Sequence, residues 1–340
     1  MKILFAAPEN AWGGFLGLIK TELPQHEFEA SGRFGFESLK GYDVLIPTMS
    51  VVSKELLAKG NRLQLIQQCG AGLEGVDLQA ARDMNIRVAN VPSDISGNAD
   101  SVAELGIYLM LGLSRNFRKM AQSLANRQTG TPSGRALSGK TVGLVGLGGI
   151  GRALARRLKV FDVHLMGIKR HDPQKAKAEL GLEWAGTPED MKELLSKSDY
   201  VILCLPLTPE NRLMVGRQTF LAMKRDAFLI NLSRGGLVDR DALEEALASE
   251  KIGGAGLDVF WEEPPDPNDP IFNYNVLATP HIAGATDVSI GGIVKAVAEN
   301  IRRLEKGSGT SIFKNIERLR ALRLIIPWQL PRATDNKNRF

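Results

Sequence analysis

Short apolar runs recur along the chain and alternate with segments in which apolar residues return at helical spacing. Near the N-terminus this alternation predicts a small α/β unit. Its strands are expected at 3–7, 28–30, 42–46, 63–68 and 86–91, with a helix at 78–84.

Beyond residue 140 the alternation becomes regular. One predicted strand ends before Gly146, and others lie at 163–168, 200–205, 228–232, 254–259 and 276–278. Helices are predicted at 152–158, 239–249 and 287–306. Two more helices are predicted to start at 187–189 and 208–210. Strands that are apolar almost throughout and are separated by helices are typical of a parallel, doubly wound sheet. We therefore expect an α/β protein whose ligands bind beyond the carboxyl ends of its strands.

A glycine-rich turn follows the strand that starts at Thr141. Its sequence is Gly146-Leu147-Gly148-Gly149-Ile150-Gly151, a G-x-G-x-x-G pattern that leads into a predicted helix. In this context Gly146 permits the turn, Gly148 lets the backbone approach a pyrophosphate, and Gly151 lets the helix pack closely on the strand. The phosphates would meet the helix N–H groups and the positive end of its dipole. The turn predicts a dinucleotide site at Gly146, Gly148, Gly149, Ile150 and Gly151, and a glycine-rich turn without a ligand is the alternative.

Composition and charge narrow the class of protein. Hydrophobic residues make up 44% and charged residues 24%, as in ordinary soluble globular proteins, and no apolar run is long enough to cross a bilayer. The first apolar run is too short for a signal peptide and predicts a buried strand. Cys69 and Cys204 form no C-x-x-C, so neither a disulfide framework nor a zinc site is expected, and the cytoplasm is the expected compartment. The net charge of +5 comes from dispersed basic residues, which do not indicate a nucleic-acid partner.

A helix that is apolar nearly all round is predicted from Ser101 to about Phe117. Such a helix must be buried on more than one side. The polar, glycine-rich segment Asn126–Ser138 follows and is expected to be an exposed arm. Helix and arm together predict a homodimer, although burial of the helix within a single chain would also explain its composition.

Candidate catalytic side chains stand at or just beyond the ends of the later predicted strands: Arg234, Glu263 and His281. In a protein that binds a dinucleotide, these are the groups that reduction of a 2-keto acid requires. An arginine holds the substrate carboxylate through two parallel hydrogen bonds. A histidine transfers a proton to or from the substrate oxygen. A glutamate orients that histidine and favours its protonated form. Of the remaining histidines, His26 and His164 have ordinary surroundings and are expected to be structural, and His171 belongs to a basic surface cluster.

Five motifs occur in one order and spacing: Gly146–Gly151, Ser233–Asp239, Gly256–Phe260, Glu262–Pro264 and Thr279–Thr286. Together they resemble the D-isomer-specific 2-hydroxyacid dehydrogenase family, and the resemblance extends from about Leu63 to about Leu304. Formate dehydrogenases share this fold but carry glutamine where Glu263 stands, since formate oxidation needs no proton-donating pair. Glu263 therefore favours the hydroxyacid branch, of the glyoxylate or hydroxypyruvate reductase type.

The resemblance implies an architecture and a set of contacts. A Rossmann nucleotide domain is implied at 99–287, and a smaller, discontinuous, flavodoxin-like lid and substrate domain at 1–98, completed by about 288–325. The polar end of the chain, 326–340, is expected to be poorly ordered. The catalytic set implied is Arg234, Glu263 and His281, and substrate contacts are implied at Ala71, Gly72, Asn98, Arg234 and His281. Further cofactor contacts are implied at Pro206, Asn211, Leu232, Ser233, Arg234, Asp258, His281 and Gly284. Of these, Asp258 would meet the carboxamide side of the nicotinamide, and Asn211 stands where the family often has threonine.

The strand that follows the glycine turn, 163–168, lacks the usual acidic residue at its end. Enzymes that use NAD commonly carry an acidic residue about twenty positions beyond the motif, on the ribose 2′-OH. Here Lys169 takes that place and Arg170 follows, while Asp172 before Pro173 is better interpreted as a helix cap. Two cations suit a 2′-phosphate, so we predict NADP as the preferred cofactor. NAD is the alternative, with Lys169 and Arg170 as mere surface charges.

The sequence thus predicts a reductase that transfers a hydride from NADPH or NADH to a small 2-keto acid such as glyoxylate or hydroxypyruvate. One alternative is a dinucleotide-sensing binding protein like the transcriptional corepressors that share this fold, although no signature of a peptide groove is visible. Another is a phosphoglycerate-type dehydrogenase, although no added regulatory domain is visible. The side chain of the substrate and the physiological direction stay open.

Overall fold

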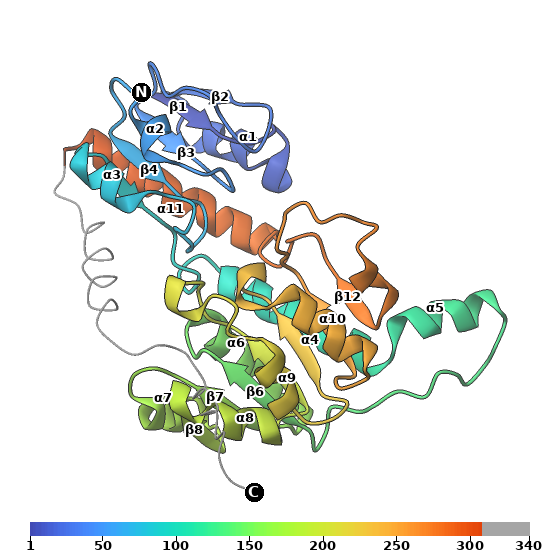
Figure 1. The fold of residues 1–340 in the computed structure, drawn as a ribbon. Helices are drawn as coiled ribbons and strands as arrows, with labels where there is room; N and C mark the ends of the chain where they lie inside the picture. Colours follow the sequence, from blue (N-terminus) through green and yellow to red (C-terminus); the bar gives the residue numbers. More distant parts are fainter. Residues whose placement is uncertain (308–340) are drawn as a thin grey trace, which may run out of the picture. The chain divides into compact units, whose positions relative to one another are not determined.

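The computed structural model describes residues 1–307. They form two compact units, one made of Met1–Ser101 with 284–307 and the other of Val102–Ala283 (Figure 1). The sequence placed these boundaries at 98 and 287; the predicted tail at 326–340 and the end of the predicted 288–325 segment lie outside the described residues. Within residues 1–307, no helix is both long enough and apolar enough to span a membrane.

The first unit is built on a five-stranded parallel sheet with the strand order β2-β1-β3-β4-β5. This is the flavodoxin-like order, which confirms the predicted fold. The strands are β1 (Lys2–Phe5), β2 (Glu27–Ala30), β3 (Val44–Ile46), β4 (Leu65–Gln67) and β5 (Arg87–Ala89). The helices of this unit are α1 (Ala11–Glu22), α2 (Lys54–Leu57), α3 (Leu78–Asp83) and α11 (Asp287–Glu305).

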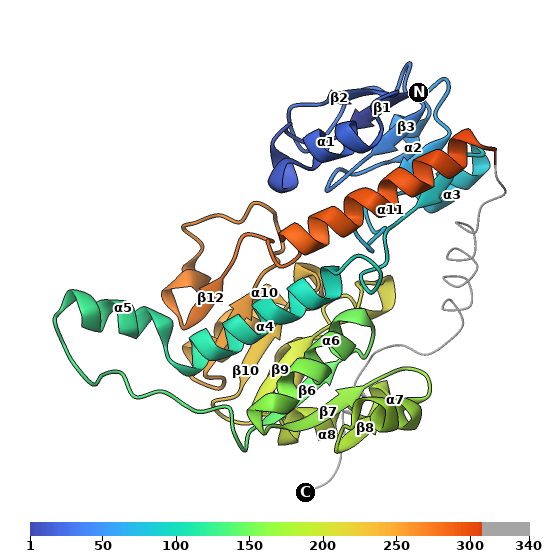
Figure 2. The same cartoon turned by 180° about the vertical axis from the view of Figure 1, so that it is seen from behind.

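Each face of this sheet has its own apolar core. On one face Ile3 packs with Val297 and Ile301 of α11, the helix that runs beside α1 (Figure 2). On the other face Leu4 packs with Leu57 of α2 and with residues of α3. Neighbouring residues of β1 therefore enter opposite cores, because side chains alternate along a strand. A strand buried on both faces is apolar without interruption, which is the pattern seen in the sequence.

The second unit is built on a seven-stranded, all-parallel sheet with the order β12-β11-β10-β9-β6-β7-β8. The chain changes direction across the sheet between β6 and β9, which makes a switch point of the kind at which nucleotides bind. This arrangement confirms the predicted doubly wound fold. The strands are β6 (Thr141–Val145), β7 (His164–Ile168), β8 (Trp184–Gly186), β9 (Tyr200–Leu203), β10 (Phe228–Asn231), β11 (Gly254–Leu257) and β12 (Val276–Ala278).

Helices cover both faces of the larger sheet. In Figure 1, α9 and α10 lie on the face turned to the viewer, and Figure 2 shows α4 and α6 on the opposite face. The helices are α4 (Asn98–Ser114, which begins in the first unit), α5 (Phe117–Ala125), α6 (Gly149–Leu158), α7 (Pro173–Leu180), α8 (Met191–Lys197), α9 (Arg217–Ala222) and α10 (Arg240–Ala248).

Three local predictions differ from the structure. The long apolar helix ends at Ser114 rather than at Phe117, because Asn116 is in the left-handed region (φ 53°) and its side chain caps α5 by accepting from the Lys119 N–H at 3.2 Å. The helix start at 208–210 gives only a short 3₁₀ turn, and α9 begins later. The short edge strand β8 was missed, because Trp, Ala and Gly form no apolar run of their own.

Candidate active site and dinucleotide site

The three candidate catalytic side chains lie on connections that leave neighbouring strands. β10, β11 and β12 are adjacent and parallel, so their carboxyl ends share one edge of the sheet. Arg234 follows β10, Glu263 lies in the long connection after β11, and His281 follows β12. The topology therefore brings these connections together although their residues are far apart in the sequence.

Glu263 and His281 form a direct pair. The Nδ1–H of His281 donates to Oε2 of Glu263 at 2.7 Å, and the Phe260 N–H donates to Oε1 at 3.0 Å. The side chains are 31% exposed for His281 and 17% exposed for Glu263. Burial raises the pKa of the Glu263 carboxyl, but the bond and charge of His281, the Phe260 N–H and the charge of Arg234 together bring that pKa below its ordinary value. Glu263 is thus a carboxylate at neutral pH and fixes the orientation of the imidazole.

Arg234 sits in a tightly bonded turn. Its backbone is extended (φ −147°, ψ 141°), and its carbonyl accepts from the Asn231 side-chain amide at 2.8 Å. The adjacent Ser233 is buried and its hydroxyl donates to the Leu203 carbonyl at 2.9 Å. One Arg234 Nη1–H bonds the Ser233 carbonyl at 2.7 Å. A guanidinium carries five donors in a fixed fork, so such a partly exposed arginine has the chemistry to hold a carboxylate.

The turn that carries His281 is held by Asp258. His281 is in the left-handed region (φ 54°), an uncommon conformation for a residue with a Cβ. Asp258, with 1% of its surface exposed, accepts from the Thr279 hydroxyl at 2.7 Å and from the N–H groups of Ile282 and Ala283 at 2.9 and 3.1 Å. Burial raises the pKa of Asp258 despite these bonds to its charged form. These three bonds over-determine the backbone around His281, which is how a strained conformation persists.

This role of Asp258 and Thr279 was missed by sequence reasoning, which assigned Asp258 to the nicotinamide and gave Thr279 no role. The register of the sheet explains the bond, because Leu257 and Ala278 are paired across β11 and β12. The next residue on each strand is then Asp258 and Thr279. Polar residues that directly follow two paired parallel strands are neighbours, so the Thr279 hydroxyl can donate a hydrogen bond to the Asp258 carboxylate.

The glycine turn has the geometry that a pyrophosphate needs. Gly146 has φ 105°, and a Cβ there would lie 2.8 Å from the Cys204 carbonyl oxygen. A Cβ on Gly151 would lie 2.0 Å from the Gly146 carbonyl oxygen, so only glycine allows α6 to approach the turn this closely. Gly148 caps α6 and has no atom within 4 Å of an added Cβ, which leaves open space over the helix N-terminus. Gly149 and Ile150 form the first turn of α6, and their N–H groups belong to the set without helical partners. The residues present fit a dinucleotide.

Lys169 and Arg170 directly follow β7 and are partly exposed. The Lys169 N–H bonds the Gly186 carbonyl at 2.9 Å, which fixes the backbone at this point. A carboxylate that the sequence reasoning did not consider, Glu179 of α7, accepts from Arg152 at 2.8 Å, and this bond is the main cause of its lowered pKa, with smaller effects of Lys175 and Lys169. The predicted phosphate site therefore has a carboxylate, Glu179, within electrostatic reach of Lys169.

Asn211 and Leu232, two of the predicted cofactor contacts, have buried side chains. The Asn211 amide, 2% exposed, donates to the Pro206 carbonyl at 2.8 Å and accepts from the Thr208 N–H at 2.7 Å, so it closes the loop after β9. Leu232 packs against Gly106 of α4, where an added Cβ would lie 2.7 Å from it. Pro206 itself is exposed. A cofactor contact of Asn211 or Leu232 stays a prediction, and the observed role of the Asn211 side chain is internal.

The remaining predicted contacts belong to the first unit. Ala71 and Gly72 follow β4 in an open loop, where the Ala71 carbonyl accepts from the Asn90 side chain at 2.6 Å. Asn98 begins α4 and donates to the Ser289 hydroxyl of α11 at 3.1 Å. Gly284 lies against Asn98, since an added Cβ would be 2.2 Å from its amide nitrogen. In residues 1–307, no three His, Cys, Asp or Glu side chains gather as ligands of a metal ion.

A family model and curated proteins resemble this chain. The model described as "D-isomer specific 2-hydroxyacid dehydrogenase, NAD binding domain" matches residues 107–283. The chain is 36% identical over 282 residues to a glyoxylate reductase of Thermococcus litoralis, covering 80% of this chain and 83% of that protein. It is 35% identical over 274 residues to a D-3-phosphoglycerate dehydrogenase of Methanocaldococcus jannaschii, covering 80% of this chain but only 51% of that protein.

A solved structure shares the fold over nearly the whole chain. The formate dehydrogenase of Staphylococcus aureus, solved in complex with NAD, superposes with a TM-score of 0.77 at 28% identity and covers 92% of this chain and 97% of its own. The family model and the curated relatives thus agree with the family that the motifs resemble, and the solved structure shares its fold.

Proposed function

The chain belongs to the D-isomer-specific 2-hydroxyacid dehydrogenase family and carries its NAD-binding domain, and we propose that it is a reductase of small 2-keto acids of the glyoxylate or hydroxypyruvate type. The observation that carries this proposal is the Glu263–His281 bond of 2.7 Å at the sheet edge that Arg234 also occupies. A carboxylate-bound imidazole and an arginine suit a substrate with a carbonyl beside a carboxylate.

The proposed mechanism assigns one task to each side chain. When bound, the dinucleotide supplies the hydride that reduces the carbonyl carbon. Arg234 holds the substrate carboxylate and polarises the adjacent carbonyl. Glu263 binds Nδ1 of His281, so the proton for the substrate oxygen comes from Nε2, the other ring nitrogen. In the oxidative direction the same Nε2 accepts the hydroxyl proton.

Lys169 and Arg170 support NADP as the preferred cofactor within this proposal. Both follow β7, the strand next to β6, where the ribose of the adenosine half is held in this fold. A cation bound to a phosphate contributes roughly 1.5–3 kcal/mol. We therefore expect kcat/KM to be about tenfold to a hundredfold higher with NADPH than with NADH.

Two double variants test the cofactor assignment. Replacing both Lys169 and Arg170 by alanine should raise KM for NADPH while leaving KM for NADH nearly unchanged. The matched control replaces Lys192 and Lys197, two exposed lysines of α8, by alanine and should change neither value. Equal kcat/KM for the two cofactors in the parent enzyme would refute the preference and leave the reductase proposal intact.

Exposed apolar side chains on α5 support a homodimer. Phe117, Met120 and Leu124 are 46%, 37% and 80% exposed, and their spacing puts them on one side of the helix. Arg118 anchors the start of α5 to the body of the second unit by donating to the carbonyls of Phe272 and Tyr274. Figures 1 and 2 show α5 leading away from the sheet of that unit. An apolar face on a projecting helix is typical of a surface that a second copy covers.

The reductase proposal is tested by a steady-state screen of 2-keto acids with each reduced cofactor. We expect turnover of glyoxylate or hydroxypyruvate. A protein that binds the dinucleotide tightly but turns over none of the acids would instead be a dinucleotide-sensing binding protein. Best activity on a phosphorylated hydroxyacid would favour the phosphoglycerate-type alternative.

A further inference from the structure

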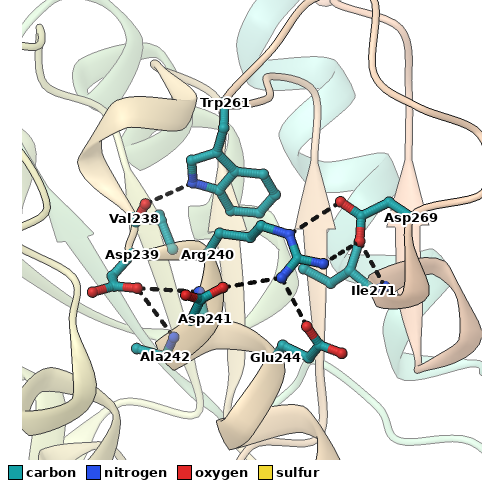
Figure 3. Close-up of polar contacts among 9 residues, drawn as sticks. All are labelled: Val238, Asp239, Arg240, Asp241, Ala242, Glu244, Trp261, Asp269 and Ile271. Atoms are coloured by element: carbon teal, nitrogen blue, oxygen red, sulfur yellow. Dashed lines mark hydrogen bonds and ion pairs between the residues drawn. The ribbon is translucent and has the colours of Figure 1, made fainter.

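A dense polar cluster joins the start of α10 to the connection that also carries Glu263 (Figure 3). Its centre is Arg240, the first residue of α10. The Arg240 Nη2 and Nε donate to the two carboxylate oxygens of Asp269 at 2.6 and 3.2 Å, and Nη1 donates to Glu244 at 2.8 Å and to Asp241 at 3.1 Å. The Arg240–Asp269 contact is thus a two-pronged bond between planar groups, the geometry that gives an ion pair its rigidity.

This bond joins two connections that both carry proposed catalytic residues. Asp269 belongs to the connection from β11 to β12, which also holds Glu263, and Arg240 follows the connection from β10 that holds Arg234. Asp269 also accepts from the Ile271 N–H at 3.0 Å, which caps the 3₁₀ turn Pro270–Asn273. Through Asp269, Arg240 is thus bonded to the backbone segment that follows the Glu263 stretch.

A second contact ties the same two connections together on the other side of Glu263. The indole N–H of Trp261 donates to the Val238 carbonyl at 2.7 Å (Figure 3). Beside it the two backbones touch, since a Cβ on Gly235 would lie 2.0 Å from the Phe260 carbonyl oxygen. Glu263 thus sits between two fixed points, Trp261 and Asp269.

Within the stretch between these points the described hydrogen bonds are local: Asp266 accepts from the N–H groups of Asn268 and Asp269 at 2.8 and 3.1 Å. Pro264, Pro265 and Pro267 have no N–H to donate, and Glu262, Asp266 and Asn268 are exposed. Long connections of this kind are mobile unless anchored. The bonds from Glu263 itself go only to the Phe260 N–H and to His281 among those described for residues 1–307.

We propose that Arg240 is a positioning residue for the reaction: through Asp269, and together with Trp261, it fixes the connection that presents Glu263 to His281. The proposal rests on the proposed function, because Glu263 matters to turnover only if His281 transfers the proton. It adds a residue that touches neither substrate nor cofactor in that mechanism.

The test compares variants that keep the shape of the side chains. Arg240→Met and Asp269→Asn each remove the two-pronged bond, and Arg240→Lys keeps the charge but not the fork. The matched control is Arg217→Met on α9. It removes a more exposed ion pair to Glu245 of α10, the helix that begins with Arg240, and does not involve the Glu263 connection. We expect kcat for keto-acid reduction to fall by up to about 100-fold in the first two variants, the loss that a misplacement of about 1 Å can cause. Arg240→Lys should lose less, and the control should keep the parental kcat.

Two further readouts separate positioning from a general loss of stability. The dissociation constant of the cofactor, measured by fluorescence titration, should stay within about twofold of the parental value, because the glycine turn is untouched. The acid limb of the kcat profile should move to higher pH, because a displaced Glu263 loses the contacts with His281, Phe260 and Arg234 that hold its pKa below the ordinary value. A structural ion pair alone would lower the melting temperature and move neither kcat nor the acid limb.

Hydrogen–deuterium exchange of the peptide spanning 259–269 tests the anchoring without any substrate. We expect at least about tenfold faster exchange in Arg240→Met and Asp269→Asn, and parental exchange in Arg217→Met. Unchanged exchange, or faster exchange with parental kcat and acid limb, overturns the inference. If the parent reduces no keto acid, the proposed function fails on its own, while the exchange result still decides whether Arg240 anchors the connection.

Discussion

Glu263→Gln is the sharpest single change that the site allows. Glutamine has nearly the same shape as glutamate, and its carbonyl oxygen can still accept from the Phe260 N–H, now at 3.0 Å. What is lost is the negative charge that receives the Nδ1–H of His281 at 2.7 Å. The variant therefore isolates charge from packing.

The expected loss follows from the bond that is weakened. A hydrogen bond to a charged group contributes about 1.5–3 kcal/mol. If that contribution is made mainly while His281 is protonated, kcat for reduction should fall about tenfold to a hundredfold, at tenfold per 1.4 kcal/mol. The acid limb of the kcat profile should also be lost, because glutamine has no carboxyl group whose protonation would remove the charge beside His281.

Stability provides an independent check with a definite sign. The pKa of Glu263 lies below its ordinary value of 4.5 in the folded protein. The carboxylate therefore stabilises the fold above that pH, and this contribution is lost as the pH falls through the lowered pKa. Glu263→Gln lacks the contribution at every pH, so its melting temperature should lie below that of the parent at neutral pH and approach it in acid.

The assay is steady-state reduction of glyoxylate at several pH values, with melting curves at the same pH values. Glu262→Gln is the matched control, because Glu262 is the preceding residue, is exposed and loses the same charge. A Glu263→Gln variant with parental kcat and an unmoved pH profile would refute the assignment of the Glu263–His281 pair to proton transfer.

Four other changes probe the remaining parts. His281→Ala should lower kcat about 10²- to 10⁴-fold with cofactor affinity retained, and an unchanged kcat would remove His281 from the mechanism. Arg234→Lys should raise KM for the keto acid and lower kcat, because one ammonium cannot replace a two-pronged grip; parental kinetics would show that the carboxylate is held elsewhere. Gly151→Ala places a Cβ 2.0 Å from the Gly146 carbonyl oxygen, so we expect weaker dinucleotide binding and a loss of about 1–3 kcal/mol in stability, checked by titration and thermal melts. Leu124→Asp should convert a homodimer to a monomer of 37.1 kDa in light scattering, and a parent that already has that mass would refute the dimer.

The sequence alone determined the parts that depend on local chemistry. Strands buried on both faces must be apolar without interruption, so β6, β7, β9, β10 and β11 were recognisable. The glycine turn was equally readable, because Gly146 and Gly151 answer local steric demands that no other residue meets. Arg234 and His281 could be placed just beyond strand ends, because the apolar runs that precede them mark the strands.

Only the tertiary structure decided which of these strand ends are neighbours and what each polar group bonds. Asp258 holds the His281 turn because β11 and β12 pair in one register, and Arg240 reaches Asp269 because two connections fold against each other. Neither contact has a local signature, since an aspartate or an arginine in an exposed loop has the same sequence pattern whether or not it has a distant partner. The end of α4 at Ser114 likewise depended on the left-handed backbone of Asn116, a conformation that hydrophobic periodicity does not register.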